Sequence, residues 1–223
     1  MYIQGLATIC LTEAVAMNDA AMKAAKSSDR KIGVKSRRVV VDDTKKLRMA
    51  ATGATQFIIN AQHSGGGWRY TPRQAGDTSV VGWQVMALVS GKSIRLPIPP
   101  LVFNGVSRFL DGVQIDGGSG YGYASPGNKP STTAIGLLSR MYMGSQKTEP
   151  ALDRGVQYLS KLGPAKGDMY YNYYGTQVLH HWGGEEWTKW NDVMREQLVK
   201  SQILKGHSAG SWNVADTHGG PGG

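Results

Sequence analysis

The segment GGGWRYTPRQAGDTSVVGWQVMAL, from Gly65 to Leu88, joins a glycine-rich turn to an apolar run. Three glycines lead into Trp68, a loop follows, and after Asp77 the chain enters an apolar run that contains Trp83. Aspartate just before a helix accepts hydrogen bonds from backbone N–H groups, so we expect Asp77 to cap a helix. The alternative is a polar role for Asp77 at the mouth of a cavity. The glycines, the loop and the cap together predict a turn that leads into a helix.

The residues before this turn recur further along the chain. A glycine, an aromatic residue, an aliphatic residue and a glutamine keep one spacing ahead of two aromatic-bearing turns: Gly53, Phe57, Ile58 and Gln62 before Trp68, and Gly105, Phe109, Leu110 and Gln114 before Tyr121. A looser third copy has Gly163 where glutamine would fall, and a fourth keeps Gln202 and Trp212 around a longer loop. Self-similarity of this kind predicts a repeat architecture.

Two kinds of helix alternate in the predicted repeat. Segments before the turns carry apolar residues every three or four positions, which is typical of amphipathic helices. Segments after the turns are apolar nearly all round, which favours burial, and they align on one glycine each: Gly5, Gly82, Gly136 and Gly175. We expect Ser131 to cap the apolar helix that contains Gly136. We expect Pro150 to lie in the first turn of the amphipathic helix that follows it. The pattern predicts an all-α fold with amphipathic outer helices and apolar inner helices.

Composition favours one folded domain over residues 1–223, with a basic surface insert at residues 27–43. The chain has a net charge of +9, and ten basic and three acidic residues between Lys23 and Arg48 account for +7 of it. A solvated loop is one interpretation of the insert, and peripheral contact with an anionic membrane is another. The insert lacks the interleaved aromatic residues that stack on bases, so no specific nucleic acid is expected.

The beginning and end of the sequence affect the expected location and partners. Met1–Met17 is apolar but contains Glu13 and lacks a basic start, so no signal peptide is expected, and no apolar run has the length of a membrane span. The sequence does not indicate in which cellular compartment the protein is located. Trp68 precedes Gly82 by fourteen residues, and the same spacing after Trp212 puts a further inner helix near position 225. We therefore expect an incomplete ring, with another subunit or the rest of a longer chain covering its open ends.

The best copy, Gly53-x3-Phe57-Ile58-x3-Gln62-x3-Gly66-x-Trp68, resembles the QW motif of squalene and oxidosqualene cyclases. It is more loosely similar to the motif of protein prenyltransferase β-subunits. The whole chain resembles a bacterial protein of the prenyltransferase/squalene-oxidase repeat type. This resemblance implies an α/α toroid around a central cavity that holds an isoprenoid. It also implies a structural role for the motif positions: Gln62, Gly66, Trp68, Gln114, Tyr121, Gln202 and Trp212.

The resemblance implies a terpene-cyclase-like or prenyltransferase-like domain that binds an isoprenoid or another apolar ligand. The alternative is a non-catalytic scaffold with the same fold, and whether the chain is an enzyme stays open. Cyclases use an Asp-x-Asp-Asp acid, but Val40-Val41-Asp42-Asp43 lacks the first aspartate. Prenyltransferases bind zinc through Asp-x-Cys and a later histidine, whereas this chain has Asp77-Thr78-Ser79 and Tyr171-Asn172-Tyr173. Serine supplies no thiolate ligand, so neither zinc nor another cofactor is expected.

Candidate site residues come from the inner helices. Those that could line a cavity are one glutamine and four aromatic residues: Trp83, Tyr142, Tyr171, Tyr174 and Gln177. Aromatic faces can stabilise a carbocation, although core packing is the alternative. Asp77 and Glu13 are the candidate catalytic acids; Glu13 qualifies only if burial raises its pKa, and an exposed or hydrogen-bonded carboxylate is the alternative. Adjacent His180 and His181 suit a helix C-terminus better than a metal site.

Overall fold

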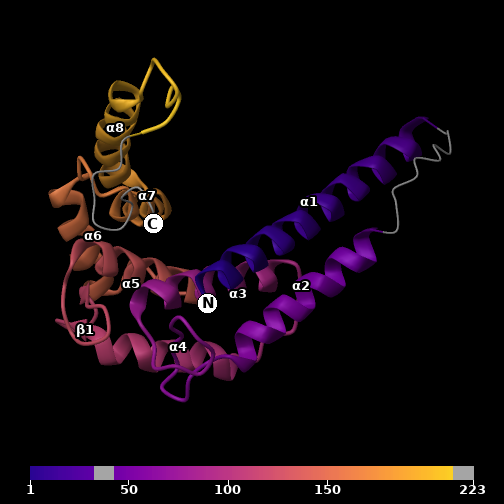
Figure 1. Ribbon diagram of the computed structural model, residues 1–223, viewed down its shortest axis with the longest axis horizontal. Coiled ribbons are helices and arrows are strands. Elements are labelled where there is room, and N and C mark those ends of the chain that lie inside the picture. The colour runs from indigo at the N-terminus through magenta and orange to yellow at the C-terminus, as the bar shows by residue number, and fades with distance from the viewer. Residues whose placement is uncertain (33–42, 213–223) are drawn as a thin grey trace. The chain divides into compact units, whose positions relative to one another are not determined.

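The computed structural model describes residues 1–32 and 43–212, and within them it confirms the all-α class (Figure 1). Side chains are described for residues 1–24 and 44–212. The helices of these residues are α1 (Tyr2–Ile32), α2 (Asp43–Asn60), α3 (Thr78–Ser93), α4 (Pro100–Val113), α5 (Pro130–Met143), α6 (Pro150–Leu162), α7 (Met169–Trp182) and α8 (Gly184–Ser201). Two short strands, β1 (Gln114–Ile115) and β2 (Gly120–Tyr121), pair antiparallel between α4 and α5.

The predicted basic insert falls mostly outside this description. The backbone of α1 continues as helix to Ile32, and α2 begins at Asp43. Residues 33–42, which include Val40, Val41 and Asp42, lie outside the described residues, as do the side chains of residues 25–43. Membrane contact through the insert therefore stays a prediction.

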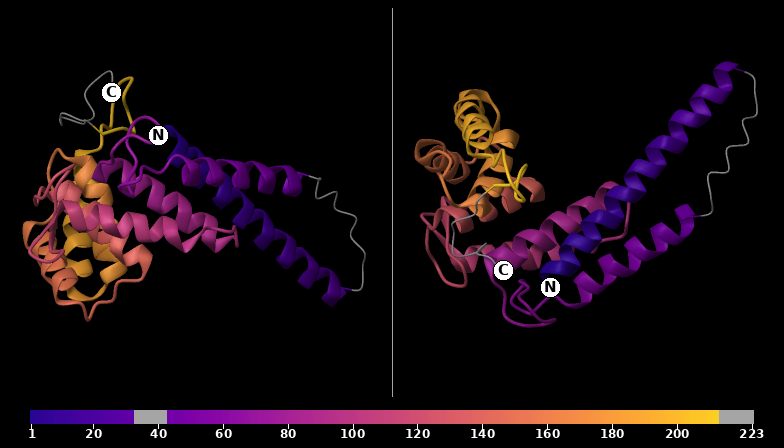
Figure 2. Two further views of the ribbon diagram at one scale, coloured as in Figure 1. Left: turned by 90° about the horizontal axis from the view of Figure 1, so that it is seen from below. Right: turned by 45° about the horizontal axis from the view of Figure 1, so that its top comes forward.

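The chain divides into two compact units, Met1–Phe109 and Leu110–Gly223. In the first unit α1 packs against both α2 and α3. In the second, α5 packs against α7, and α6 and α8 both pack against α7 (Figure 2). Closure of these helices into a toroid stays a prediction.

One packing rule recurs in both units. In the first unit, α3 contacts both members of the α1–α2 pair, so it lies in the groove between them. In the second unit, α7 contacts both members of the α5–α6 pair in the same way. Each of these grooves lies between an apolar inner helix and the amphipathic outer helix that follows it. In each unit the next apolar helix of the chain, α3 or α7, contacts both helices of the pair, and its buried apolar residues contribute to the stability of that unit.

Two of the aligned inner-helix glycines allow close packing on an aromatic ring. A Cβ added at Gly136 would lie 2.3 Å from Cγ of Tyr121, and one added at Gly175 would lie 2.6 Å from Cη2 of Trp190. Heavy atoms do not approach so closely without displacement, so only glycine fits at these two positions in the present packing. The alignment on glycine in α5 and α7 thus has a steric cause.

The helix ends agree with the sequence in two places and differ in one. Asp77 is the N-cap of α3, and its Oδ1 accepts a hydrogen bond of 2.9 Å from the backbone N–H of Val80, which confirms the predicted cap. Pro150 is the first residue of α6, as predicted. The prediction for Ser131 is wrong, because α5 begins at Pro130 with Lys129 as its N-cap. Proline without an N–H is well suited to the first helical position, and it places Ser131 inside the first turn.

Candidate functional site

The joint between α2 and α3 is held by two side chains of the QW-like motif. The Gln62 amide Nε2 donates to the carbonyl of Gly66 at 2.8 Å and to that of Val102 in α4 at 2.9 Å. The Trp68 indole Nε1 donates to the carbonyl of Ile58 at 2.8 Å. Gln62 and Trp68 therefore bind separate backbone carbonyls rather than each other. Together they fix the end of α2, the turn and the start of α4.

The last joint, after α8, repeats these hydrogen bonds. Gln202 Nε2 donates to the carbonyl of Gly210 at 3.0 Å, and Trp212 Nε1 donates to the carbonyl of Leu198 at 2.8 Å. The indole acceptor is the residue four positions before the glutamine, as Ile58 is four positions before Gln62. The fourth copy thus forms the same clamp as the first, although its loop is longer.

The two middle joints use other contacts. Gln114 pairs with Tyr121 in the β1–β2 ladder, and the Tyr121 hydroxyl accepts a hydrogen bond of 3.3 Å from Arg140 Nε in α5. Burial raises the pKa of Tyr121, although the hydrogen bond from Arg140 opposes the shift. At the α6–α7 joint, the Asn172 side chain binds both the N–H and the carbonyl of Ala165. The clamp of the first joint is therefore kept only at the two ends of the series.

The aromatic residues of the joints differ sharply in exposure. Trp68 is 0% exposed and Tyr121 is 1% exposed, whereas Trp212 is 37% exposed. In α5, the inner helix that follows Tyr121, Gly136 packs on its ring. Trp212 is the last residue that the structure describes. Its indole is hydrogen-bonded but only partly buried.

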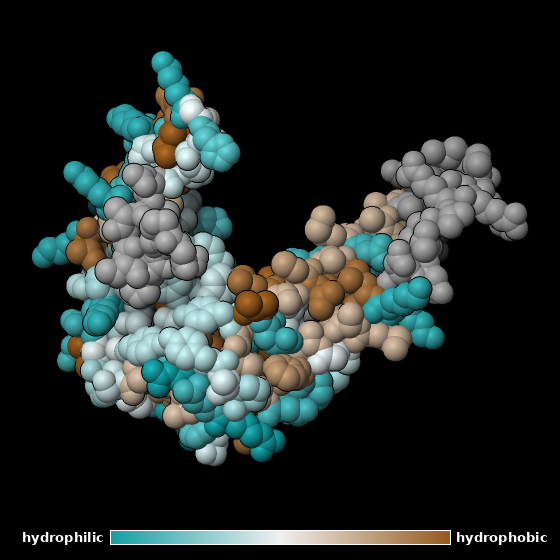
Figure 3. Space-filling view, viewed as in Figure 1, coloured by the Kyte–Doolittle hydropathy of each residue, from teal (hydrophilic) through white to brown (hydrophobic). Residues whose placement is uncertain are grey.

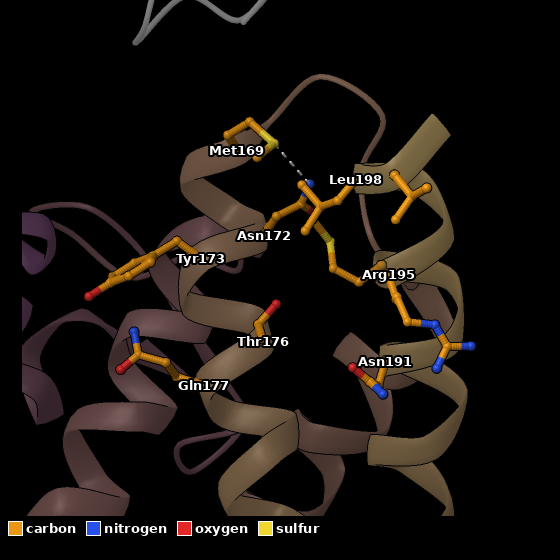
Figure 4. Close-up of a pocket in the computed structure, with 10 residues that line it drawn as sticks. Met169, Asn172, Tyr173, Thr176, Gln177, Asn191, Arg195 and Leu198 are labelled. Carbon is orange, nitrogen blue, oxygen red and sulfur yellow. Dashed lines mark hydrogen bonds between the residues drawn. The ribbon is translucent and has the colours of Figure 1, made fainter. Parts of the chain in front are cut away.

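A groove opens beside this last joint. It has a volume of about 620 Å³ and runs between α7 and α8. We call it the α7–α8 groove, and its lining residues are Met169, Asn172, Tyr173, Thr176 and Gln177 of α7 and Asn191, Met194, Arg195, Leu198 and Val199 of α8. Figure 4 shows Met169 and Leu198 toward one end, with Thr176 and Asn191 facing each other further along. Leu198, whose carbonyl accepts the Trp212 hydrogen bond, connects the groove to the last clamp.

The Trp190 side chain joins α8 to α7 next to the groove residue Thr176. Trp190 of α8 lies against Gly175, and its Nε1 donates to Thr176 Oγ1 at 2.9 Å. The Trp190 and Tyr171 rings meet edge to face at 5.7 Å between centroids. These contacts hold α7 and α8 together.

A neutral polar cluster lies on the side of α7 that faces α5. The Tyr142 hydroxyl donates to Gln177 Oε1 at 3.2 Å and lies 3.3 Å from His181 Nε2. Burial, followed by the charge of Tyr173, raises the pKa of Tyr142. Burial, followed by the charge of His180, lowers the pKa of His181. Both shifts favour the uncharged forms at neutral pH, so the cluster offers hydrogen bonds without charge.

The structure separates the five predicted cavity residues. It brings Tyr142 and Gln177 together in the neutral cluster, and Gln177 also lines the α7–α8 groove. Tyr171 and Tyr174 are fully buried, so they belong to the core and line no open cavity. Burial raises the pKa of Tyr171, whose hydroxyl donates to the Gly163 carbonyl. Trp83 belongs to the other unit, where it lies beside Gly5 of α1. Core packing, the alternative interpretation, holds for Tyr171 and Tyr174.

The side chains of the two candidate acids, Asp77 and Glu13, both make hydrogen bonds within the fold. Asp77 is buried as the cap of α3, with Arg69 Nε 3.7 Å from its Oδ2. Glu13 is exposed, and its Oε1 accepts a hydrogen bond of 2.6 Å from Ser90. The prediction of a buried Glu13 is therefore wrong, and the exposed, hydrogen-bonded alternative holds. Among the described residues, no group of three His, Cys, Asp or Glu side chains could hold a metal ion.

The two adjacent histidines lie in the last turn of α7, as expected from the sequence. Gly183 follows that turn with a φ of 72°, a left-handed conformation that suits glycine, and α8 begins at once. No described helix is long and apolar enough to cross a membrane.

Sequence reasoning missed most of one wall of the groove. Asn191, Met194, Arg195, Leu198 and Val199 of α8 line the groove, and none of them was predicted as a site residue. The sequence shows Val199 as an apolar residue next to Leu198, but only the structure shows that it is 69% exposed.

Comparisons with known proteins do not assign the chain to a family. No family model matches it, and no curated protein matches it either.

Proposed function

We propose that the chain is a helical-hairpin repeat module of the QW type that binds an apolar helix in the α7–α8 groove. The observation that supports this proposal best is the packing rule of the fold. The grooves of the α1–α2 and α5–α6 pairs are each filled by an inner helix. The equivalent groove of the α7–α8 pair is open and bears no helix in the part of the chain that the structure describes.

The residues that line the groove favour binding of a helix over catalysis. Aliphatic and thioether side chains dominate the α8 wall, and methionine adapts to partners of irregular shape. No acidic side chain lines the groove, so the proposal includes no general acid. An amphipathic helix that places its apolar face in a hydrophobic groove is a common mode of recognition.

The test uses a fluorescein-labelled amphipathic peptide made of leucine and lysine. We expect it to bind the wild-type chain, and Val199→Glu to weaken binding about tenfold or more, because a carboxylate would replace an apolar contact with the peptide and would lose water on binding. Val193→Glu is the matched control, since Val193 is also an exposed valine of α8 but does not line the groove. Equal effects of the two variants, or no binding by the wild type, would refute the proposed function.

An isoprenoid ligand is the second candidate, and one observation favours it. Gln177 Nε2 is buried without a hydrogen-bond partner among the described residues, beside the neutral cluster and on the groove. This amide could donate to the hydroxyl of a prenyl alcohol. With farnesol as the probe, Gln177→Leu is then expected to weaken binding about fivefold, because a hydrogen bond in a dry site contributes about 1 kcal/mol. Gln157→Leu on α6, which lies outside the groove, should leave farnesol binding unchanged.

A further inference from the structure

The first helix carries an exposed stripe of its own. Its members recur every three or four residues and so share one face of α1: Ile3, Leu6, Cys10, Glu13 and Met17. Four of the five are apolar or weakly polar, and Ile3 is 83% exposed. Hydrophobic residues gather along this helix in the space-filling view (Figure 3). We call this face the α1 stripe.

The remaining faces of α1 are those of an inner helix. They pack against α2 and α3, and Gly5 lies against Trp83 of α3. Val15, at 0% exposure, belongs to the core of this unit. Within the described residues, Ile3, Leu6 and Cys10 of the stripe are thus exposed, whereas Glu13 at its far end accepts a hydrogen bond from Ser90 of α3.

The stripe and the groove match in length. A helix rises about 1.5 Å per residue, so Met169 to Gln177 of α7 spans about 12 Å. Ile3 to Cys10 of α1 spans about 10 Å by the same measure. The three side chains of this segment, Ile3, Leu6 and Cys10, can therefore occupy the whole groove.

The charges of the two surfaces also match. Glu13 is the one acidic residue of the α1 stripe, and it follows the Ile3–Cys10 segment by one turn. Arg195 is the one basic residue that lines the groove. Its guanidinium binds Asp192 at 3.4 Å through one nitrogen, which leaves further N–H donors for a second carboxylate.

We propose that α1 of one copy docks through its stripe into the α7–α8 groove of a second copy. The proposal rests on the proposed function, since it names the helix that the groove binds. The docked α1 takes the place in the α7–α8 groove that α7 itself takes in the α5–α6 groove. Each copy then contributes two different surfaces, which defines a heterologous, head-to-tail interface.

The test is sedimentation velocity of the full chain from about 1 μM to about 100 μM, the range in which an interface of modest affinity becomes populated. The wild type is expected to associate as the concentration rises. Ile3→Glu removes the stripe and Val199→Glu removes the groove, so each variant alone should stay monomeric. Leu101→Glu and Val193→Glu, at exposed apolar residues outside both surfaces, should associate as the wild type does.

Mixing the two monomeric variants identifies the head-to-tail arrangement. The Ile3→Glu chain keeps its groove and the Val199→Glu chain keeps its stripe, so an equimolar mixture should form a dimer that grows no further. A symmetric stripe-to-stripe contact predicts instead that Val199→Glu associates normally. That result, a mixture that stays monomeric, or a wild type that is monomeric throughout, would overturn the proposal.

The leucine–lysine peptide separates this failure from failure of the proposed function. If the wild type stays monomeric but Val199→Glu still abolishes peptide binding, the groove binds a helix other than α1. If peptide binding is absent as well, both proposals are wrong. Circular dichroism of each variant establishes that it is folded, so that loss of association is not loss of structure.

Discussion

The first and last joints of the chain have the same clamp in different surroundings. In both, a glutamine amide and a tryptophan indole bind backbone carbonyls, and the indole hydrogen bond is 2.8 Å long. Trp68 is nevertheless fully buried, while Trp212 is 37% exposed. The clamp therefore forms from residues close in sequence, whereas burial of the aromatic ring requires helices that pack around it. Four pairs of variants test how packing, hydrogen bonding and charge contribute to stability at and near these joints.

The largest difference is expected between the two tryptophans. Trp68→Ala should lower the free energy of unfolding by about 3–5 kcal/mol, because it removes a fully buried aromatic side chain. Trp212→Ala should cost about 1 kcal/mol, since mainly one hydrogen bond and a partial contact are lost. Urea denaturation followed by circular dichroism measures both. Equal losses would show that the clamp, not the packing, stabilises the joints.

The next pair concerns glycines near the closed second joint. Gly136→Ala should destabilise the protein by about 1–3 kcal/mol, because its Cβ would overlap the Tyr121 ring. Gly112→Ala in α4 is the control, since nothing lies within 4 Å of the added Cβ. It should stabilise the helix by about 0.5–1 kcal/mol. Thermal unfolding measures the change in Tm of both variants. If Gly136 is needed for close packing on Tyr121, Gly136→Ala lowers Tm while Gly112→Ala raises it. If it is not needed, both substitutions change Tm in the same direction.

The glutamines should differ less. Gln62→Leu removes two hydrogen bonds in a partly buried place and leaves two carbonyls without that donor, at a cost of about 1–2 kcal/mol. Gln202→Leu removes a single exposed hydrogen bond and should cost about 0.5 kcal/mol or less. The urea midpoints of the two variants show which substitution lowers stability more. A larger loss for Gln202→Leu than for Gln62→Leu would contradict the assignment of Gln62 as the link to α4.

The smallest expected effect is that of pH on α7. Because the pKa of His181 is lowered in the folded chain, the unfolded chain binds a proton more readily. Stability should be unaffected above about pH 6.5 and fall as the pH drops from there through the lower folded value. His181→Gln should reduce this acid destabilisation, measured as the change in Tm between neutral and mildly acidic buffer. His207→Gln, at an exposed histidine, serves as the control and should leave the pH dependence of Tm unchanged. A Tm of the wild type that rises on acidification would contradict the sign.

The sequence predicted the elements well because their signals are local. Apolar spacing located the outer helices, and Asp77 and Pro150 marked two helix starts that the structure confirms. The error at Ser131 came from weighing its hydroxyl while the neighbouring Pro130 already supplied a first helical residue. Even the clamp at Gln202 and Trp212 could be predicted through a longer loop, because the spacing to the helix end is kept.

The site was harder to predict because the inner helices are apolar on nearly every face. In α7, Tyr171 and Tyr174 are buried while Tyr173 lines the groove, and periodicity cannot separate three neighbouring tyrosines of one chemistry. The exposure of Glu13 depends likewise on which face of α1 meets α3. An open groove forms where two helices pack together and no third helix covers them. The sequence of either helix alone therefore does not predict it.

Docking of α1 from a second copy into the α7–α8 groove would change the surroundings of the last clamp and of its Trp212. Fluorine NMR of the 5-fluorotryptophan-labelled chain tests it directly, with Trp68 and Trp212 assigned through their phenylalanine variants and exposure read from broadening by a soluble paramagnetic agent. Trp68 should be protected at every concentration. Trp212 should be broadened in dilute samples, become protected as the chain associates, and stay broadened in Ile3→Glu. A Trp212 signal that is protected at the lowest concentration, or that stays exposed while the wild type associates, would contradict the account.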